Sequence, residues 1–557
     1  MTRAGATGAA IFYHPEAYTT SGPKLMGRNA AGQSFLDGFL AHARGSGACA
    51  LVDATAHADP FRAAVAASGR AGPVTVLDRT GLPGLERAGT LFYPGPDIEA
   101  HARRRAAFGA TRWSLTGVTH TTASAGVMDV FTGLVAGNVQ PWDAIILTST
   151  AVRDQVAWML AAEEERLARR FGPFRWTQPQ MPVIPLGLNS AAFASDAAAR
   201  AAARARLGVG PDAIVVLFIG RLAYHAKAHP LAMYQALQAA ARGDGARHEV
   251  VLVECGWFAN DHIAAAFAAA SGQACPDVRV VRLDGRDAEA RGTAWAGADV
   301  FCSLSDNIQE TFGLTPIEAM AAGLPVVVSD WDGYRDTVRD GVDGFRVPTL
   351  MPVAGLGGDL ALRHGLGLDT YDLYCGLTCA LVAVDVDATT QAFRQLFGSA
   401  ELRRRMGEAG RQRAREVFDW AAVIPRYEAL WDELAELRRA AAAQPQPRPR
   451  WPGRPDPFAA FAGYSTHHLG PDTVLELGAP DLDTALARAA ELRALAMVDY
   501  ARVVLPADAD VAVVLGAAAA GPAPAHALVA AVPADRRTRA LRGLGALAKL
   551  GLLRLPR

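Results

Sequence analysis

The chain has 557 residues, which is enough for two or three domains that each bury a core of their own. Its hydrophobic fraction of 51% and its charged fraction of 20% describe a soluble globular protein. With a formal net charge of −1, the chain as a whole has no electrostatic attraction to nucleic acid or anionic lipid, so a nucleic-acid partner is not expected.

The first region alternates runs typical of strands with runs typical of helices, which predicts a doubly wound α/β domain over residues 1–205. Seven strands are expected there: Ala10–Tyr13, Ala50–Asp53, Val74–Leu77, Thr90–Tyr93, Ser114–Val118, Ala144–Leu147 and Pro182–Pro185.

Two features of this domain suggest ligand contacts. Glycines at 22, 27 and 32, with Lys24 among them, lie in the loop after the first strand, where glycine lets the backbone approach a ligand. His120 follows the strand 114–118, at the edge where α/β sheets bind ligands. The alternatives are an ordinary flexible loop and a structural histidine.

A second doubly wound domain is predicted over residues 206–440, and it opens with the strand 213–220. Gly220 lets the following loop turn, and the loop carries Arg221 and Lys227. An arginine fork and a lysine ammonium after a strand suit a diphosphate. The alternative is a solvated basic loop. Further strands are expected at 249–254, 278–283, 299–303 and 324–328.

The most informative stretch is residues 303–330, which read SLSDNIQETFGLTPIEAMAAGLPVVVSD and predict strand, turn, short helix and strand. We expect Thr315 to cap the helix, Pro316 to occupy its first position and Gly323 to close it. The unpaired N–H groups of Gly313, Leu314 and Thr315 would then form a seat for a phosphate.

Two carboxylates flank this predicted seat, Glu310 in the turn and Glu318 in the helix. A carboxylate repels a phosphate but accepts hydrogen bonds from sugar hydroxyls, so a nucleotide sugar would explain both the amides and the acids. The alternative is that Glu318 completes a capping box and that Glu310 is a solvated loop acid.

The sequence ETFGLTPIEAMAAGLPVVVSD resembles that of the retaining glycosyltransferases of the family 4 type, the glycosyl transferases group 1. Glu310 and Glu318 match the E-x7-E motif of that family. The resemblance covers about residues 8–435 and is strongest over 213–335. It implies the GT-B fold, in which two facing Rossmann-like domains hold the donor on the second and the acceptor mainly on the first.

The resemblance also implies roles for the residues above. Glu318 would hold the ribose, Glu310 would position the donor sugar, and His120 would hydrogen-bond the transferred sugar. Gly27 would lie in a loop that faces acceptor and donor, and main chain at 282–285 would lie near the base. The leaving diphosphate would be stabilised without a metal by Arg221, Lys227 and the amides of Gly313, Leu314 and Thr315, with Gly220 among the donor-binding residues. Ala228 replaces the glycine that usually follows the family's lysine, so the loop shape stays open.

The implied reaction moves a sugar from a UDP-, GDP- or ADP-sugar to an acceptor hydroxyl with retention at the anomeric carbon, and needs no further cofactor. The acceptor would be a carbohydrate, a lipid-linked molecule or a small molecule. Two alternatives stay open: a nucleotide-sugar epimerase of the same architecture, and a non-catalytic sensor of sugar nucleotides whose basic C-terminal module binds DNA or a membrane.

The remaining regions lie at the edges of the resemblance or outside it. Residues 344–388 enlarge a usually short connection and would shape an acceptor site or be inert. Residues 441–457 form a proline-rich linker, and 458–557 an α-rich module whose leucines and bases near the end predict an amphipathic helix. Such a helix would lie on a membrane, end a winged-helix module or face a core.

The sequence also predicts the compartment. Six scattered cysteines, two of them in apolar strand-like runs, suggest reduced and buried thiols, and the C-x3-C pair at 375 and 379 has no partner pair for a zinc site. We expect no signal peptide, and prolines at 522 and 524 argue against a membrane span in the uncharged stretch 511–533. These features predict a cytoplasmic protein, with peripheral membrane contact left open.

Overall fold

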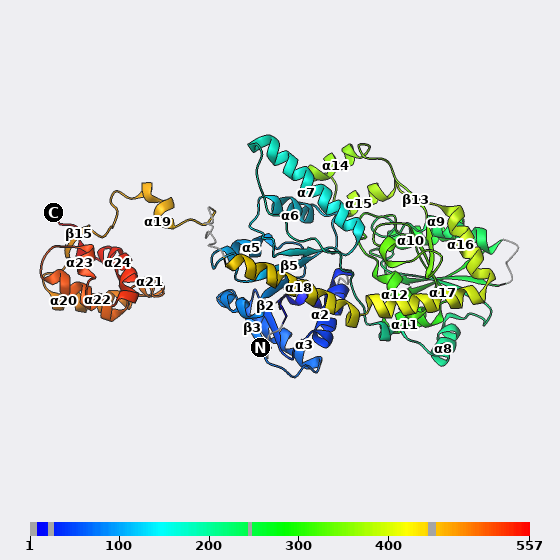
Figure 1. Cartoon of the computed structure of the whole chain (residues 1–557), viewed down its shortest axis with the longest axis horizontal. Helices are drawn as coiled ribbons and strands as arrows, with labels where there is room; N and C mark the ends of the chain where they lie inside the picture. The colour runs from blue at the N-terminus through cyan, green and yellow to red at the C-terminus, as the bar shows by residue number, and fades with distance from the viewer. Residues whose placement is uncertain (1–7, 20–26, 243–247, 444–452, 557) are drawn as a thin grey trace. The chain divides into compact units, whose positions relative to one another are not determined.

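The computed structural model describes residues 8–19, 27–242, 248–443 and 453–556. The chain divides into two units, residues 1–450 and 451–557 (Figure 1). The first unit holds two six-stranded sheets and the second a small three-stranded sheet with helices. These are the two Rossmann-like folds and the α-rich module that the sequence predicts.

The first sheet is parallel throughout, in the order β3-β2-β1-β4-β5-β6. Its strands are β1 (Ala10–Tyr13), β2 (Ala48–Val52), β3 (Val74–Leu77), β4 (Thr90–Tyr93), β5 (Ser114–Val118) and β6 (Ala144–Ile146). Six predicted strands are confirmed. The seventh, Pro182–Pro185, is wrong: it makes only an isolated bridge from Val183 to Leu147, because its two prolines offer no N–H to a ladder.

The helices around the first sheet follow the strands in alternation. They are α1 (Pro15–Tyr18), α2 (Gly27–His42), α3 (Ala58–Ala67), α4 (Leu85–Ala88), α5 (Glu99–Ala106), α6 (Ala125–Val135) and α7 (Thr150–Phe171). Ser149 caps the longest of them, α7, by accepting from the N–H of Val152 at 3.2 Å.

The second sheet is also parallel, in the order β12-β11-β10-β7-β8-β9. Its strands are β7 (Ile214–Ile219), β8 (Val250–Gly256), β9 (Arg279–Asp284), β10 (Val300–Ser303), β11 (Val326–Ser329) and β12 (Gly344–Val347). The five predicted strands are confirmed, and β12 adds an edge strand. The accompanying helices are α8 (Ala197–Leu207), α9 (Leu231–Ala241), α10 (Asp261–Ala274), α11 (Ala288–Gly297), α12 (Leu314–Ala322), α13 (Tyr334–Thr337), α16 (Val386–Gly398) and α17 (Ala400–Arg413).

The helix α18 (Trp420–Ala442) follows the second sheet in sequence but packs on the first. Its Trp420, Tyr427 and Trp431 are buried in the core that also contains Phe35 and Phe39 of α2. The indole of Trp420 donates to Ser34 at 2.8 Å. The chain therefore returns to the first domain after the second sheet, and α18 ties the two sheets together.

The enlarged connection between β12 and α16 contains two short strands and two helices. They are β13 (Thr349–Leu350), α14 (Gly358–Gly365), α15 (Tyr371–Cys379) and β14 (Ala383–Val384). All six cysteines of the chain lie within the described ranges, and each is buried with a free thiol, as the sequence predicts.

The second unit has the strand β15 (Val474–Leu477) between β16 (Ala523–Pro524) and β17 (Leu553–Arg554). Its helices are α19 (Pro457–Ala460), α20 (Leu482–Arg493), α21 (Ala496–Asp499), α22 (Asp508–Ala519), α23 (Ala525–Leu528) and α24 (Ala534–Lys549). The amphipathic helix is confirmed as α24, but Leu544 and Leu547 are buried in the unit's core. That face of α24 is thus not available to a membrane, whereas Arg536 and Arg542 are exposed. Across the described residues, every helix is too short or too polar to span a bilayer.

Candidate active site

The helix α12 begins at Leu314 with Gly313 as its N-cap, two residues earlier than the sequence suggests, so the prediction that Pro316 is its first residue is wrong. The prediction that Thr315 caps this helix is therefore wrong. Gly313 has φ 88°, and an added Cβ would lie 2.1 Å from the ring of Tyr334, so glycine suits this position both in conformation and in space. The first-turn amides of Leu314 and Thr315 have no acceptor within the helix, which leaves them for an anion.

Glu310 joins this helix start to the basic loop after β7. One carboxylate oxygen accepts from the N–H of Gly313 at 3.1 Å, and the other lies 3.5 Å from the ammonium of Lys227. Burial by itself would raise the pKa of Glu310, but Lys227 and the backbone N–H groups of Thr311 and Phe312 outweigh it and lower the pKa. Glu310 is therefore ionised, and it holds Lys227 beside the start of α12.

Arg221 reaches the same place from the start of the basic loop. Its guanidinium lies 3.4 Å from the side-chain oxygen of Gln309 and 3.4 Å from the carbonyl of Ala226. Gly220 precedes Arg221 at the carboxyl end of β7. The carbonyl oxygen of Gly220 lies so close to Gly256 that a Cβ added to Gly256 would be 2.0 Å from it. The structure thus gathers Arg221, Lys227 and Glu310 beside the N-cap Gly313.

His120 comes to this cluster from the first sheet. The hydroxyl of Thr311, the neighbour of Glu310, donates to the carbonyl of His120 at 2.8 Å. The hydroxyl of Thr148, after β6, donates to the carbonyl of Thr311 at 3.5 Å. The His120 side chain lines a small pocket with Val118 and others. The carboxyl ends of both sheets therefore meet at the segment 310–313.

The glycine-rich loop of the first domain lies only partly within the described residues. Gly27 is the first residue of α2, whereas Gly22 and Lys24 fall outside the described ranges. The expectation that this loop faces acceptor and donor stays a prediction.

Glu318 lies on α12, five residues after the N-cap, so it does not form the capping box that the sequence allowed. Burial raises its pKa to about 7, and the nearby Arg291 of α11 acts in the opposite direction. Arg291 donates to the carbonyl of Gly285 at 2.8 Å, which places Glu318 near the end of β9. The guanidinium of Arg282 instead donates to the carboxylate of Glu254 at 2.9 Å. Only the last residues of the predicted base-binding stretch 282–285 therefore lie near Glu318.

Asp332 is a site residue that the sequence analysis missed. It follows β11, has φ 35°, and one of its oxygens is buried without a hydrogen-bond partner among the described residues. Burial raises its pKa well above the usual value, and the charge of Glu310 raises it further. A positive φ strains the backbone of any residue other than glycine and raises the free energy of the folded state. Such strain is typical of functional sites. The turn WDGY after a strand was the signal that could have found it.

Replacing Asp332 by asparagine should raise the thermal unfolding midpoint. The raised pKa means that the folded state favours the protonated acid, so Asp332 contributes stability near pH 4 that is lost as the pH rises. Asparagine stays neutral and tolerates positive φ, so a gain on the order of 1 kcal/mol is expected at pH 8 and a smaller one at pH 5. Thermal scans at both pH values measure it. Asp212 is exposed, so Asp212→Asn is the control. An equal gain in thermal stability in Asp212→Asn would show that burial of the Asp332 carboxylate is not the cause.

The enlarged connection borders the candidate site, and whether it shapes an acceptor site stays a prediction. The hydroxyl of Tyr371, at the start of α15, lies 3.0 Å from the hydroxyl of Thr121, next to His120. Gly376 packs so closely on the basic loop that a Cβ would lie 2.9 Å from His225. Asn307 donates to the carbonyl of His225 at 3.0 Å. The insertion α15 thus covers the basic loop and reaches the first domain.

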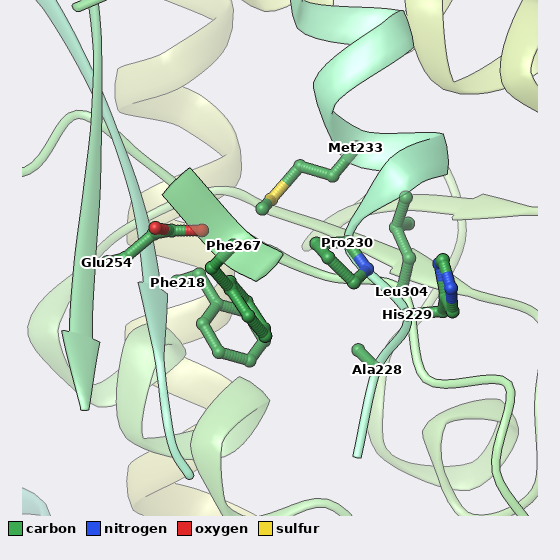
Figure 2. Close-up of a pocket in the computed structure, with 8 residues that line it drawn as sticks. All are labelled: Phe218, Ala228, His229, Pro230, Met233, Glu254, Phe267 and Leu304. Atoms are coloured by element: carbon green, nitrogen blue, oxygen red, sulfur yellow. The ribbon is translucent and has the colours of Figure 1, made fainter. Parts of the chain in front are cut away.

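A small cavity lies behind the basic loop, lined mostly by apolar side chains (Figure 2). Ala228 and His229 of the loop border it, with Phe218, Met233 and Phe267 around it. Its volume of about 10 Å³ has room for about one water molecule. It cannot hold a nucleotide, so it is a gap in the packing beside Ala228 and His229 and not the donor site.

Comparison with known proteins gives one family match and several partial relatives. Residues 213–354 match the family described as glycosyl transferases group 1. The D-inositol 3-phosphate glycosyltransferase of Geodermatophilus obscurus is 28% identical over 283 residues, which are 48% of this chain and 52% of that protein. The phosphatidyl-myo-inositol mannosyltransferase of Mycobacterium leprae is 48% identical over 63 residues, 11% of this chain and 16% of that protein.

Similar solved structures are more distant in sequence. Anabaena HepE in complex with UDP and glucose is 14% identical with a TM-score of 0.48, covering 76% of this chain and 99% of that one. The chain spans less than two thirds of the length of the two curated relatives above. The matched segment is the one that carries Arg221, Lys227, Glu310 and Glu318, and it is similar to the glycosyl transferases group 1 family.

Proposed function

We propose that the protein is a retaining glycosyltransferase that moves a sugar from a nucleoside diphosphate sugar to an acceptor hydroxyl. The observation that carries the proposal is the Glu310 carboxylate, held between the ammonium of Lys227 and the N–H of Gly313 at the start of α12. Arg221 lies beside it. A diphosphate is the ligand that two cations and a helix start favour, and sugar hydroxyls are the ligand that an adjacent carboxylate favours.

Donor binding would exchange the partners of these groups. The diphosphate would take Lys227, Arg221 and the amides of Leu314 and Thr315. Glu310 would give up Lys227 and accept hydrogen bonds from hydroxyls of the donor sugar. Because the sugar–phosphate bond breaks with the electron pair leaving to the diphosphate, negative charge grows on the phosphate oxygens. Cations and amides fixed there stabilise the transition state more than the bound donor, and we infer that two side-chain cations supply this charge without a metal.

The first domain would supply the acceptor side. Thr311 bonds the carbonyl of His120, so the His120 residue is fixed next to Glu310, where its side chain can hydrogen-bond the transferred sugar. Gly27, at the start of α2, and Gly220, at the end of β7, would let main chain approach the donor. Tyr371 lies within hydrogen-bonding distance of Thr121, and we propose that it limits the size of the acceptor that can enter.

Glu318 gives the proposal a pH dependence. We propose that Glu318 accepts hydrogen bonds from the ribose, which requires the ionised carboxylate, and burial raises its pKa to about 7. Affinity for a nucleotide sugar should therefore fall several-fold between pH 8 and pH 6, as Glu318 takes up a proton. Titration calorimetry across this range measures it. Glu318→Gln should bind weakly with a flat profile, whereas a variant that keeps the wild-type profile would remove Glu318 from this role.

The donor and acceptor can be found by a two-step experiment. Protection against thermal unfolding by a panel of UDP-, GDP- and ADP-sugars identifies the donor, because a ligand of the folded state raises stability by mass action. Since two relatives are named for inositol-containing substrates, we propose inositol phosphates and phosphatidylinositol as the first acceptors to test. NMR of the product then reads the anomeric configuration. Retained configuration supports the proposal, and turnover of donor alone to an epimer contradicts it.

A further inference from the structure

Two histidines and one aspartate form a cluster at the edge of the first sheet, separate from the site above. His14 follows β1, Asp53 follows the neighbouring strand β2, and His57 belongs to the short helical turn 55–57. One potential ligand atom from each lies within 4.8 Å of those of the other two, and all three residues are half-buried.

The three side chains are already oriented towards one another. Nδ1 of His57 lies 2.8 Å from a carboxylate oxygen of Asp53. The ring of His14 meets the ring of His57 edge-on, with centroids 4.6 Å apart and planes at 75°. Within the described ranges, no hydrogen bond to the His14 ring is found. A local bond between Asp53 and His57 explains that pair, but it does not explain why a second imidazole from another strand converges on it.

Imidazole nitrogens with one carboxylate oxygen make a donor set that suits a divalent transition metal such as Zn²⁺. Ligands about 2.0 Å from such an ion at tetrahedral angles lie about 3.3 Å apart, so the ion can replace the proton between His57 and Asp53 with a small widening of that contact. The proton of neutral His57 is then carried on Nε2, so that Nδ1 can bind the ion, and neutral His14 supplies the third ligand.

We propose that His14, Asp53 and His57 bind one divalent transition-metal ion. Three protein ligands leave a coordination position for water or for an oxygen of a bound molecule. The site lies at the carboxyl edge of the first sheet, the same edge from which His120 projects after β5. In the order β2-β1-β4-β5, two strand spacings separate His14 from His120, about 10 Å. The metal site stands independently of the proposed sugar transfer.

The test is titration of the protein, without an affinity tag, with ZnCl₂ at pH 7.5 and with CoCl₂ for its visible absorption. One ion per chain should bind, with the Co²⁺ spectrum of nitrogen and oxygen ligands. His14→Gln and Asp53→Asn should each weaken binding about 100-fold while circular dichroism stays unchanged.

The control is the double variant His467→Gln with His468→Gln, which removes adjacent exposed histidines in the second unit. It should bind Zn²⁺ as the wild type does. The proposal is overturned if the wild type shows no saturable binding, if His14→Gln binds normally, or if the control loses the ion. If His14→Gln failed to fold, the Co²⁺ spectrum of Asp53→Asn would be the test. A spectrum unchanged from that of the wild type would overturn the proposed metal site.

Discussion

Replacing Glu310 by glutamine should lower kcat by a factor of about 10² to 10³ and leave donor affinity nearly unchanged. The carboxylate is ionised and close to Lys227 and the Gly313 amide, and in the proposed function this is where the donor sugar would meet the diphosphate. Glutamine keeps the shape but removes the charge that orients the sugar hydroxyls. Because Lys227 loses its carboxylate partner, it becomes more available to the diphosphate, which offsets the loss of sugar contacts in binding.

Steady-state kinetics and calorimetry with the identified donor separate these two effects. Glu436→Gln is a matched control, because Glu436 is an exposed acid on α18. It should leave kcat within a factor of two of the wild type. A Glu310→Gln enzyme with full turnover, or one that loses donor binding as strongly as it loses turnover, would contradict the role assigned to Glu310.

Arg221→Ala should weaken both donor binding and turnover. A charge-assisted hydrogen bond contributes about 1.5–3 kcal/mol, so a loss of roughly 10- to 100-fold in donor affinity is expected. A further loss in kcat follows because the same cation meets the growing charge on the leaving diphosphate. Arg221→Lys should recover part of the binding but not the two-pronged contact that a guanidinium makes with phosphate oxygens.

The control for Arg221 is Arg175→Ala, because Arg175 is an exposed arginine of the first domain. Calorimetry with the nucleoside diphosphate and with the complete donor distinguishes the contacts. Arg221→Ala should lose affinity for both ligands by a similar factor. If it lost affinity only for the complete donor, Arg221 would contact the sugar and not the diphosphate.

Much of the fold was predictable because most of its parallel strands are buried on both faces and therefore appear in the sequence as continuous apolar runs. Strands such as β7 and β11 are wholly buried, and their sequences IVVLFI and VVVS show it. The same argument failed at residues 182–185, where the apolar run lies between two prolines. The cap of α12 was misplaced for another reason: the capping propensity of Thr315 favoured that residue, whereas the N-cap is Gly313, whose φ of 88° and closeness to Tyr334 suit glycine.

The candidate site was predictable only where it is local in sequence. The spacing of Glu310, Gly313 and Glu318 within one strand-turn-helix unit could be interpreted directly. The contact of Thr311 with His120 joins residues 191 positions apart, and Asp332 and Tyr371 reach the site through packing that no local pattern encodes. The role of the insertion therefore required the structure.

A crystal structure of the protein with its nucleoside diphosphate tests the central claim most directly. The account predicts phosphate oxygens within about 3.2 Å of the amides of Leu314 and Thr315, with Arg221 and Lys227 on the other side and Glu310 released from Lys227. A diphosphate bound away from the start of α12, with Lys227 still paired to Glu310, would contradict it.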